Sequence, residues 1–131
     1  MEKIKIKPAF VDERGSIWDL LMNEQIDHVG MLISKKGSIR GKHYHKVQKQ
    51  YTLVLKGKIR IVTKNVTKAD SKIESLDIDE MEMVLFPPFY YHSLEALEDS
   101  KCLIFTSKSR IGNSYEEDTI RIENIESFKL T

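Results

Sequence analysis

Short β-forming segments separated by turn signals make up most of this chain, and the signals recur every 8 to 12 residues or so. Residues 50–56 and 58–63 are clear examples, and Lys56-Gly57 predicts a hairpin turn between them. Such spacing is typical of an all-β sandwich or barrel. The best helix candidate is one short segment, residues 18–26. Since 131 residues hold one core of ordinary size, we expect a single domain over residues 1–131.

The two ends of the chain bear on assembly. Lysine and isoleucine alternate over residues 3–7 and Pro8 follows, which predicts an edge strand. Because edge strands often pair between copies, we expect a homodimer. The polar tail from Ser109 contains a strand-like stretch at 119–123, which could pack along an outer sheet or exchange with a partner chain.

Cysteine usage and hydropathy indicate the compartment. No apolar run approaches the roughly 20 residues that a membrane span needs, and the N-terminus resembles a strand rather than a signal peptide. The single Cys102 excludes an internal disulfide and suits a reducing environment. It lies in an apolar run, so we expect a buried and inert thiol. We therefore expect a cytoplasmic protein with no membrane partner.

The net charge is only +1, but the cations concentrate in the middle of the chain. Residues 35–72 hold 12 Lys and Arg against one acid, Asp70, whereas the chain from Ile73 on holds 13 acids and 5 basic residues. The middle segment could offer a positive field to an anionic ligand. Alternatively, its strands pair with acidic ones across a sheet. Nucleic acid is not expected, because aromatic residues are not interleaved with the cations as stacking platforms require.

Residues 37–57 carry two histidines, His43 and His45, with almost no acid nearby. Side chains alternate along a strand, so both histidines point to one face and Tyr44 points to the other. His92 begins a later strand-like segment, and a sheet that folds back on itself would bring the three imidazoles together. Convergent imidazoles indicate either a metal site or acid–base chemistry. The alternative is three unrelated surface histidines.

The spacing of these residues resembles the first motif of the cupin family. The matching positions are Gly37, His43, His45, Gln50 and Gly57, with Gln50 where the family usually has glutamate. The second motif is matched in part by Pro87 and His92, with Phe89 in place of its glycine. The resemblance implies a double-stranded β-helix, the jelly-roll barrel of single-domain cupins, and the number of predicted strands agrees with it.

Within cupins, residues 12–20, 37–50 and 83–97 most resemble the small RmlC-like sugar-nucleotide proteins, above all the dTDP-4-keto-6-deoxyglucose 3,4-ketoisomerases. Those isomerases carry an Arg-Gly pair just before an HxHK segment, as at Arg40-Gly41 here. The dTDP-4-dehydrorhamnose 3,5-epimerases are similar through RG-x-HY, without the second histidine. The C-terminal cupin of capsular-polysaccharide reductase/epimerases is similar through RG-x-HYH, and there a glutamate helps to hold zinc. The resemblance implies a nucleotide-linked keto sugar as substrate, in surface-polysaccharide synthesis.

The cofactor stays open at this stage. A typical metallocupin site has three histidines and one carboxylate, so the ligands here would be His43, His45, His92 and Gln50. Gln50 supplies a neutral amide oxygen, which is a weaker ligand for a hard cation than a carboxylate. Three imidazoles could still hold zinc, iron, nickel or manganese. The similarity to the ketoisomerases favours a reaction that requires no cofactor.

Without metal, moving the keto group needs a base, a group that stabilises the enolate oxygen and a proton shuttle. His43 or His45 could be the base while the other protonates the developing oxygen. Tyr91 is a candidate acid, as a tyrosine is in the epimerase relatives. Arg40 is the candidate diphosphate ligand, although alternation places it on the face opposite to His43 unless a bulge at Gly41 turns it inward. Otherwise Arg40 is an exposed ion-pairing residue.

The remaining candidate substrate-binding residues are Lys42, Gln50, Tyr90 and His92. Gln50 would bond a sugar hydroxyl or fix an imidazole tautomer. Tyr90 or Tyr91 would stack on the nucleotide base, unless these tyrosines serve only in packing.

Three functions are consistent with these patterns. The first is an isomerase or epimerase of nucleotide-linked 4-keto-6-deoxy sugars. The second is a metal-dependent cupin enzyme acting on a small organic substrate. The third is a non-catalytic barrel that binds nucleotide sugars. The central basic segment favours an anionic ligand and therefore the first.

Overall fold

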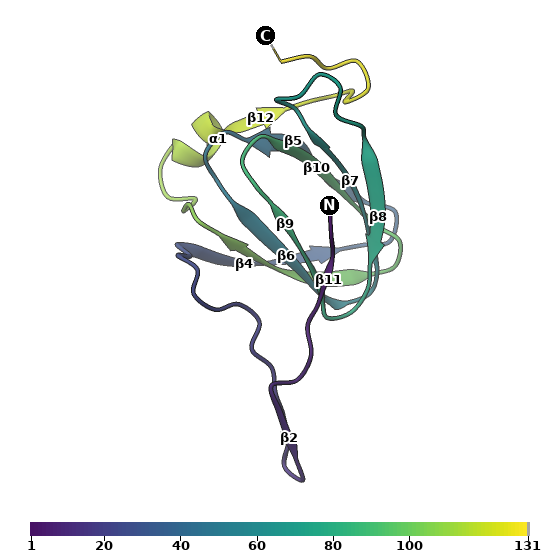
Figure 1. Ribbon diagram of the computed structural model, residues 1–131, viewed down its shortest axis with the longest axis vertical. Helices are drawn as coiled ribbons and strands as arrows, with labels where there is room; N and C mark the ends of the chain where they lie inside the picture. Colours follow the sequence, from purple (N-terminus) through teal and green to yellow (C-terminus); the bar gives the residue numbers. More distant parts are fainter. Residues whose placement is uncertain (131) are drawn as a thin grey trace.

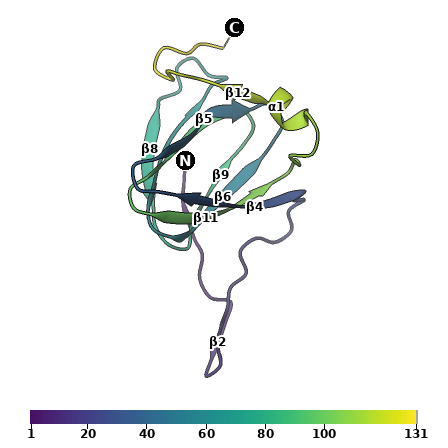
Figure 2. The same ribbon diagram turned by 180° about the vertical axis from the view of Figure 1, so that it is seen from behind.

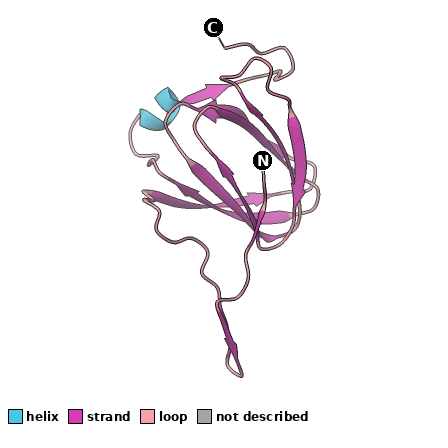
Figure 3. Cartoon of the chain, in the orientation of Figure 1, coloured by secondary structure: helices cyan, strands magenta, loops and turns pink. Residues whose placement is uncertain are grey.

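The computed structural model describes residues 1–130, and its regular secondary structure consists almost entirely of antiparallel strands (Figure 1 and Figure 3). Sheet 1 has the strand order β1-β9-β6-β11-β4, and sheet 2 has the order β12-β5-β10-β7-β8. The strands are β1 (Ile4–Lys5), β2 (Phe10–Asp12), β3 (Gly15–Ile17), β4 (His28–Ser34), β5 (Ile39–His45), β6 (Gln50–Lys56), β7 (Ile59–Asn65), β8 (Glu74–Ile78), β9 (Glu82–Phe86), β10 (Tyr90–Ala96), β11 (Ser100–Thr106) and β12 (Thr119–Arg121). Among residues 1–130 the sole helix is α1 (Ser114–Asp118), which is not long and apolar enough to cross a membrane. The predicted all-β jelly-roll barrel is confirmed.

The alternation of side chains along the strands separates the interior of the barrel from its outer faces. Val54 of sheet 1 and Ile61 of sheet 2 belong to one apolar cluster between the sheets, whereas Leu53, next to Val54, packs in a second cluster outside sheet 1. Cys102 lies in the interior cluster, and burial raises the pKa of its thiol to about 11. The structure thus agrees with the prediction of a buried, unreactive cysteine.

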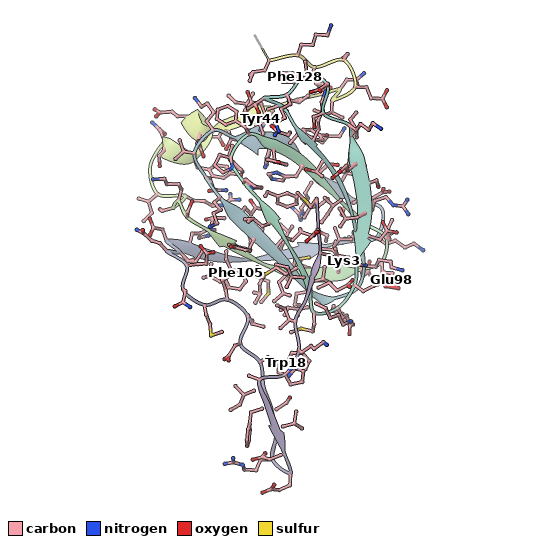
Figure 4. The ribbon with its side chains drawn as sticks, viewed as in Figure 1. Lys3, Trp18, Tyr44, Glu98, Phe105 and Phe128 are labelled. Carbon is pink, nitrogen blue, oxygen red and sulfur yellow. The ribbon has the colours of Figure 1, made fainter. Side chains whose placement is uncertain are left out.

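The C-terminal segment covers the outer face of sheet 2. Tyr44 packs there with Ile122 and Ile125, and Phe128 lies close to it in Figure 4, with 6.1 Å between the two ring centroids. The strand-like stretch of the tail becomes β12, which pairs with β5 of its own chain. Of the two alternatives for the tail, packing along an outer sheet is therefore the one that the structure shows.

The predicted helix at residues 18–26 is wrong, because this segment is irregular. Leu20 and Leu21 pack against the outer cluster of sheet 1. Glu24 accepts hydrogen bonds from the Tyr51 hydroxyl and from Lys49. These contacts with distant strands fix the backbone of the segment more strongly than its modest helix propensity does.

The N-terminal region has two parts. The predicted first strand is short, and as β1 it forms one edge of sheet 1 beside β9. After it, β2 and β3 form a separate hairpin, residues 10–17, which we call the arm. Figure 1 and Figure 2 show from both sides that the arm projects away from the barrel.

A β-bulge in β5 sets the register of the histidines. His92 pairs with His43 and Ser93 pairs with Gly41, so Lys42 is the additional residue. Gly41 has φ +87°, and a Cβ atom there would lie 2.8 Å from the carbonyl oxygen of His92. The bulge also places Arg40 opposite Leu94, whose side chain lies in the interior cluster. This is the register that an inward-facing Arg40 needs.

Replacing Gly41 tests the bulge. Gly41→Ala forces a side chain into the left-handed region, at about 1–2 kcal/mol, and into contact with the His92 carbonyl, at about 1–3 kcal/mol more. Gly37→Ala is the matched control, because Gly37 has φ +88° and nothing within 4 Å of the added carbon. Urea denaturation should show a clearly larger loss of stability for Gly41→Ala. Equal losses in the two variants would contradict the contact.

Candidate active site

The polar end of the barrel interior holds the candidate site. In β10, His92 precedes Leu94 and Ala96, which belong to the interior apolar cluster. In β6, Gln50 and Thr52 likewise precede Val54. One end of the interior is therefore apolar and the other is lined by polar side chains.

The structure brings the three predicted histidines together at this polar end. The ring nitrogens of His43, His45 and His92 that could bind a metal all lie within 4.8 Å of one another. His45 and His92 are 2% and 1% exposed, whereas His43 is half-buried. The His92 ring also stacks on Phe86 of sheet 1, with 4.3 Å between the centroids. The cluster thus lies between the two sheets, and His43 is the member that solvent reaches.

Hydrogen bonds fix the tautomers of the two buried rings. His92 Nδ1 lies 3.0 Å from the carbonyl oxygen of Tyr90, which can only accept, so Nδ1 carries the proton. His45 Nδ1 lies 3.2 Å from the hydroxyl of Thr119, whose own proton goes to the carbonyl oxygen of Tyr115. In the described part of the chain neither Nε2 atom has a partner. Each buried ring therefore presents a free lone pair.

All three imidazoles are neutral near pH 7. Burial is the main cause and lowers the pKa of His43 to about 4, with further lowering by His45, Arg121 and Arg110. Burial also lowers the pKa of His45 to about 4, although Asp118 acts in the opposite direction. The pKa of His92 falls well below its usual range, first through burial and then through His43. The site therefore holds proton acceptors rather than cations.

Two arginines near the cluster were missed by the sequence reasoning. Arg121 lies opposite His43 in the β12–β5 pairing and forms a two-point ion pair with Glu116. The guanidinium of Arg110 lies 4.4 Å from the centroid of the Tyr115 ring, which is itself 5.6 Å from the ring of His45. The only sequence signal was the position of Tyr115 between the two arginines, of which Arg121 lies within the strand-like stretch 119–123.

Two of the predicted site residues lie away from the histidines in the structure. Tyr91 packs on the outer face of sheet 2 with Tyr44, because it alternates with the inward-facing His92. That position does not support its predicted role as catalytic acid. Arg40 has the predicted inward register, but its guanidinium bonds Ser34 and the carbonyl of Ile33 on β4. That position does not support its predicted role at the diphosphate.

The other predicted residues remain near the polar end. The Gln50 amide donates to Thr52 and accepts a long bond, 3.4 Å, from Gln48. Tyr90 is half-buried and shares the inward register of His92. Lys42 is exposed within the bulge. Their roles as substrate ligands stay predictions.

Acid should destabilise the fold through the histidine cluster. In the unfolded chain, His43 and His45 bind protons below the ordinary histidine pKa of 6.5. In the folded protein they bind protons only near their lowered pKa of about 4. The free energy of unfolding should therefore fall as pH drops from 6.5 to 4, by up to about 1.4 kcal/mol per pH unit for each histidine. Urea titrations at several pH values measure this slope.

The variant His43→Asn serves as the comparison, because it removes one half-buried imidazole. Its slope between pH 6.5 and 4 should be shallower than that of the wild type. Identical slopes would show that His43 does not contribute to the acid sensitivity.

Comparison with known proteins agrees with this fold. Residues 10–120 match a family described as polysaccharide biosynthesis C-terminal domain. No curated protein sequence matches the chain. Among solved structures, dTDP-4-dehydrorhamnose 3,5-epimerase from Sulfolobus tokodaii is 25% identical with a TM-score of 0.74, and the match covers 92% of this chain and 75% of that one.

Two further structures share the fold. The sugar 3,4-ketoisomerase QdtA from Thermoanaerobacterium thermosaccharolyticum, in complex with TDP, is 19% identical with a TM-score of 0.74 over 93% of this chain and 88% of that one. CapF, in complex with 3-isopropenyl-tropolone, is 26% identical with a TM-score of 0.66, over 91% of this chain and 34% of CapF. The match of residues 10–120 covers most of the sequence, and the chain therefore belongs to the polysaccharide biosynthesis C-terminal domain family.

Proposed function

We propose that the protein isomerises or epimerises a nucleotide-linked 4-keto-6-deoxy sugar by proton transfer at the histidine cluster, without a required cofactor. The observation that carries the proposal is the cluster of three neutral imidazoles inside the barrel, with His43 open to solvent. The similar structures support it, because one is a dTDP-sugar epimerase and another a sugar ketoisomerase bound to TDP. The family description supports a role in polysaccharide synthesis.

The 3,4-ketoisomerisation can be assigned to individual groups. His43, the accessible imidazole, takes the proton from ring carbon 3, next to the keto group. His45 Nε2, which has no partner in the described chain, accepts the hydroxyl proton of the same carbon as the new carbonyl forms. Two protons then return, one to carbon 4 and one to its oxygen. The reaction is an internal redistribution, so it needs no external oxidant or reductant.

The diphosphate has cationic candidates on the same side as the cluster. Arg121 faces the same side of the β12–β5 pair as His43, and exposed ion pairs such as its pair with Glu116 are weak enough to yield to a diphosphate. A cavity of about 330 Å³ is lined by Lys46 and Lys108, together with Tyr115 and the two acids Glu117 and Asp118. We assign the diphosphate to these cations and leave Arg40 out of the site.

The decisive experiment is proton NMR of dTDP-4-keto-6-deoxyglucose incubated with the protein in heavy water. Ketoisomerisation should remove the carbon 3 proton and place deuterium at ring carbon 4 of the 3-keto product, whereas epimerisation would place deuterium at carbon 3. His43→Asn should lower kcat by about 10²- to 10⁴-fold because it removes the base. His28→Asn is the matched control, since His28 lies on β4 outside the cluster, and it should keep full activity.

Absence of exchange, together with thermal stabilisation by the nucleotide sugar, would contradict catalysis and favour the non-catalytic binding barrel. Loss of activity in His28→Asn equal to that in His43→Asn would contradict the assignment of the base.

A second candidate function is metal-dependent catalysis, because the free Nε2 lone pairs of His45 and His92 suit a metal ion. With His43 they would hold zinc, iron, nickel or manganese, which would act as a Lewis acid. The fit is incomplete. Two ligands of a tetrahedral zinc lie about 3.4 Å apart, whereas the nitrogens here spread over up to 4.8 Å, and the Gln50 amide is bonded to Gln48 and Thr52.

Elemental analysis of protein purified without added metal separates the two candidates. The proton-transfer proposal predicts deuterium exchange that survives extensive chelation. Stoichiometric metal that is lost together with activity would favour the metal-dependent function instead.

We also propose that the protein acts as a homodimer, formed through an apolar strip on the outer face of β4. Val29, Met31 and Ile33 are 57–63% exposed. Val29 and Met31 continue the outer cluster of sheet 1, because they pair with Phe105 and Leu103 of β11. The arm presents further exposed apolar residues, Phe10, Val11 and Ile17, with Trp18 at its base (Figure 4). A sheet face that stays apolar to its edge favours burial against a partner.

Placing a charge in the strip tests the dimer. Met31→Glu should shift the protein from dimer to monomer in sedimentation velocity, because it buries a carboxylate in the interface. Lys68→Glu, a charge change in the loop after β7 of sheet 2, is the control and should leave the dimer intact. A wild type that sediments as a monomer at micromolar concentration would contradict the proposal.

A further inference from the structure

Thr119 connects the C-terminal segment to the histidine cluster. It caps the C-terminus of α1, begins β12 and lies opposite His45 in the β12–β5 pairing. Its side chain is buried, and its hydroxyl donates to the Tyr115 carbonyl over 2.6 Å. Because a hydroxyl has one proton, its contact with His45 Nδ1 at 3.2 Å must be an acceptance from the ring.

We infer that Thr119 is a positioning residue that holds the proton of neutral His45 on Nδ1 and so keeps Nε2 open as the proton acceptor of the reaction. The catalytic role of Nε2 in this inference rests on the proposed function. The position of the His45 proton on Nδ1 does not depend on it. A ring protonated on Nε2 would point a donor into the cluster and could not take the hydroxyl proton of the sugar.

Asp118 lies next to Thr119 but does not hold the proton of His45 on Nδ1. Its Oδ2 is 3.8 Å from His45 Nδ1, which is too long for a hydrogen bond. The two carboxylate oxygens accept instead from the main-chain N–H groups of Val47 and Gln48, at 2.7 and 3.0 Å. Asp118 therefore holds the turn after β5, and Thr119 holds the ring.

The two buried histidines differ in how their tautomers are set. At His92 the proton is held by the main-chain carbonyl of Tyr90, which no side-chain replacement removes. At His45 it is held by a side chain 74 residues away in sequence. A single substitution at Thr119 can therefore change the tautomer of one imidazole and leave the other as it is.

Thr119→Val removes the hydroxyl at nearly constant shape, and Thr119→Ser keeps it. Nitrogen-15 NMR of the imidazoles in the full chain at pH 7 reports which ring nitrogen of His45 carries the proton. The wild type and Thr119→Ser should show the proton on Nδ1, and Thr119→Val should show a mixture or the proton on Nε2. In the isomerase assay, kcat should fall about 10- to 100-fold for Thr119→Val with a smaller change in KM, and Thr119→Ser should restore most of it.

The inference is overturned if Thr119→Val keeps the proton on Nδ1, or if its tautomer changes while kcat does not. It is also overturned if Thr119→Ser loses as much activity as Thr119→Val, because the role would then be one of shape. If wild-type protein shows no exchange on the sugar nucleotide, the proposed function fails. The NMR comparison of the three proteins then still decides whether Thr119 sets the tautomer.

Discussion

Burial of three imidazoles between two sheets is the constraint on which the rest of the site depends. Taking them out of water keeps them neutral, and each of the two deepest rings retains a lone pair with no partner among the described residues. An unsatisfied buried nitrogen costs about 1–3 kcal/mol, and native structures hold few such atoms. The cost makes sense if a substrate or ion completes these bonds during function.

The sequence predicted the shared face of His43 and His45 because that geometry is local, whereas His92 was placed beside them by its match to the second cupin motif. The two-residue spacing of His43 and His45 sets their common face, and Gly41 indicated the bulge that aligns β5 with β10. Strand positions followed from turn signals and alternation, which depend on neighbouring residues and on the period of a strand. The jelly roll was implied by the resemblance to cupins, and the number of predicted strands agreed with it.

What the sequence did not reveal depends on contacts between distant segments. Thr119 and Arg121 meet the histidines only because β12 closes onto β5, and nothing in residues 109–121 states that pairing in advance. The irregular course of residues 18–26 has the same origin, since Leu20 and Leu21 pack on sheet 1. The orientation of Tyr91 had a simpler signal, because alternation next to His92 already placed its side chain on the opposite face.

The same lone pairs serve a proton acceptor and a metal ligand, so the surroundings decide between the two uses. Two guanidinium groups, those of Arg110 and Arg121, act on the cluster and oppose an added dication, while no carboxylate joins the three histidines as a ligand in the described chain. The same cations favour an anionic substrate and the enolate charge that develops in isomerisation. Charge therefore weighs toward proton transfer.

The most direct test of this account is a pH titration of the histidine side chains by NMR in the metal-free protein. The account predicts that the signals of His43 and His45 stay those of neutral imidazole through pH 6 and change only near pH 4. Titration of both near the ordinary value of 6.5 would mean that the rings are hydrated and the cluster is not the desolvated site described above.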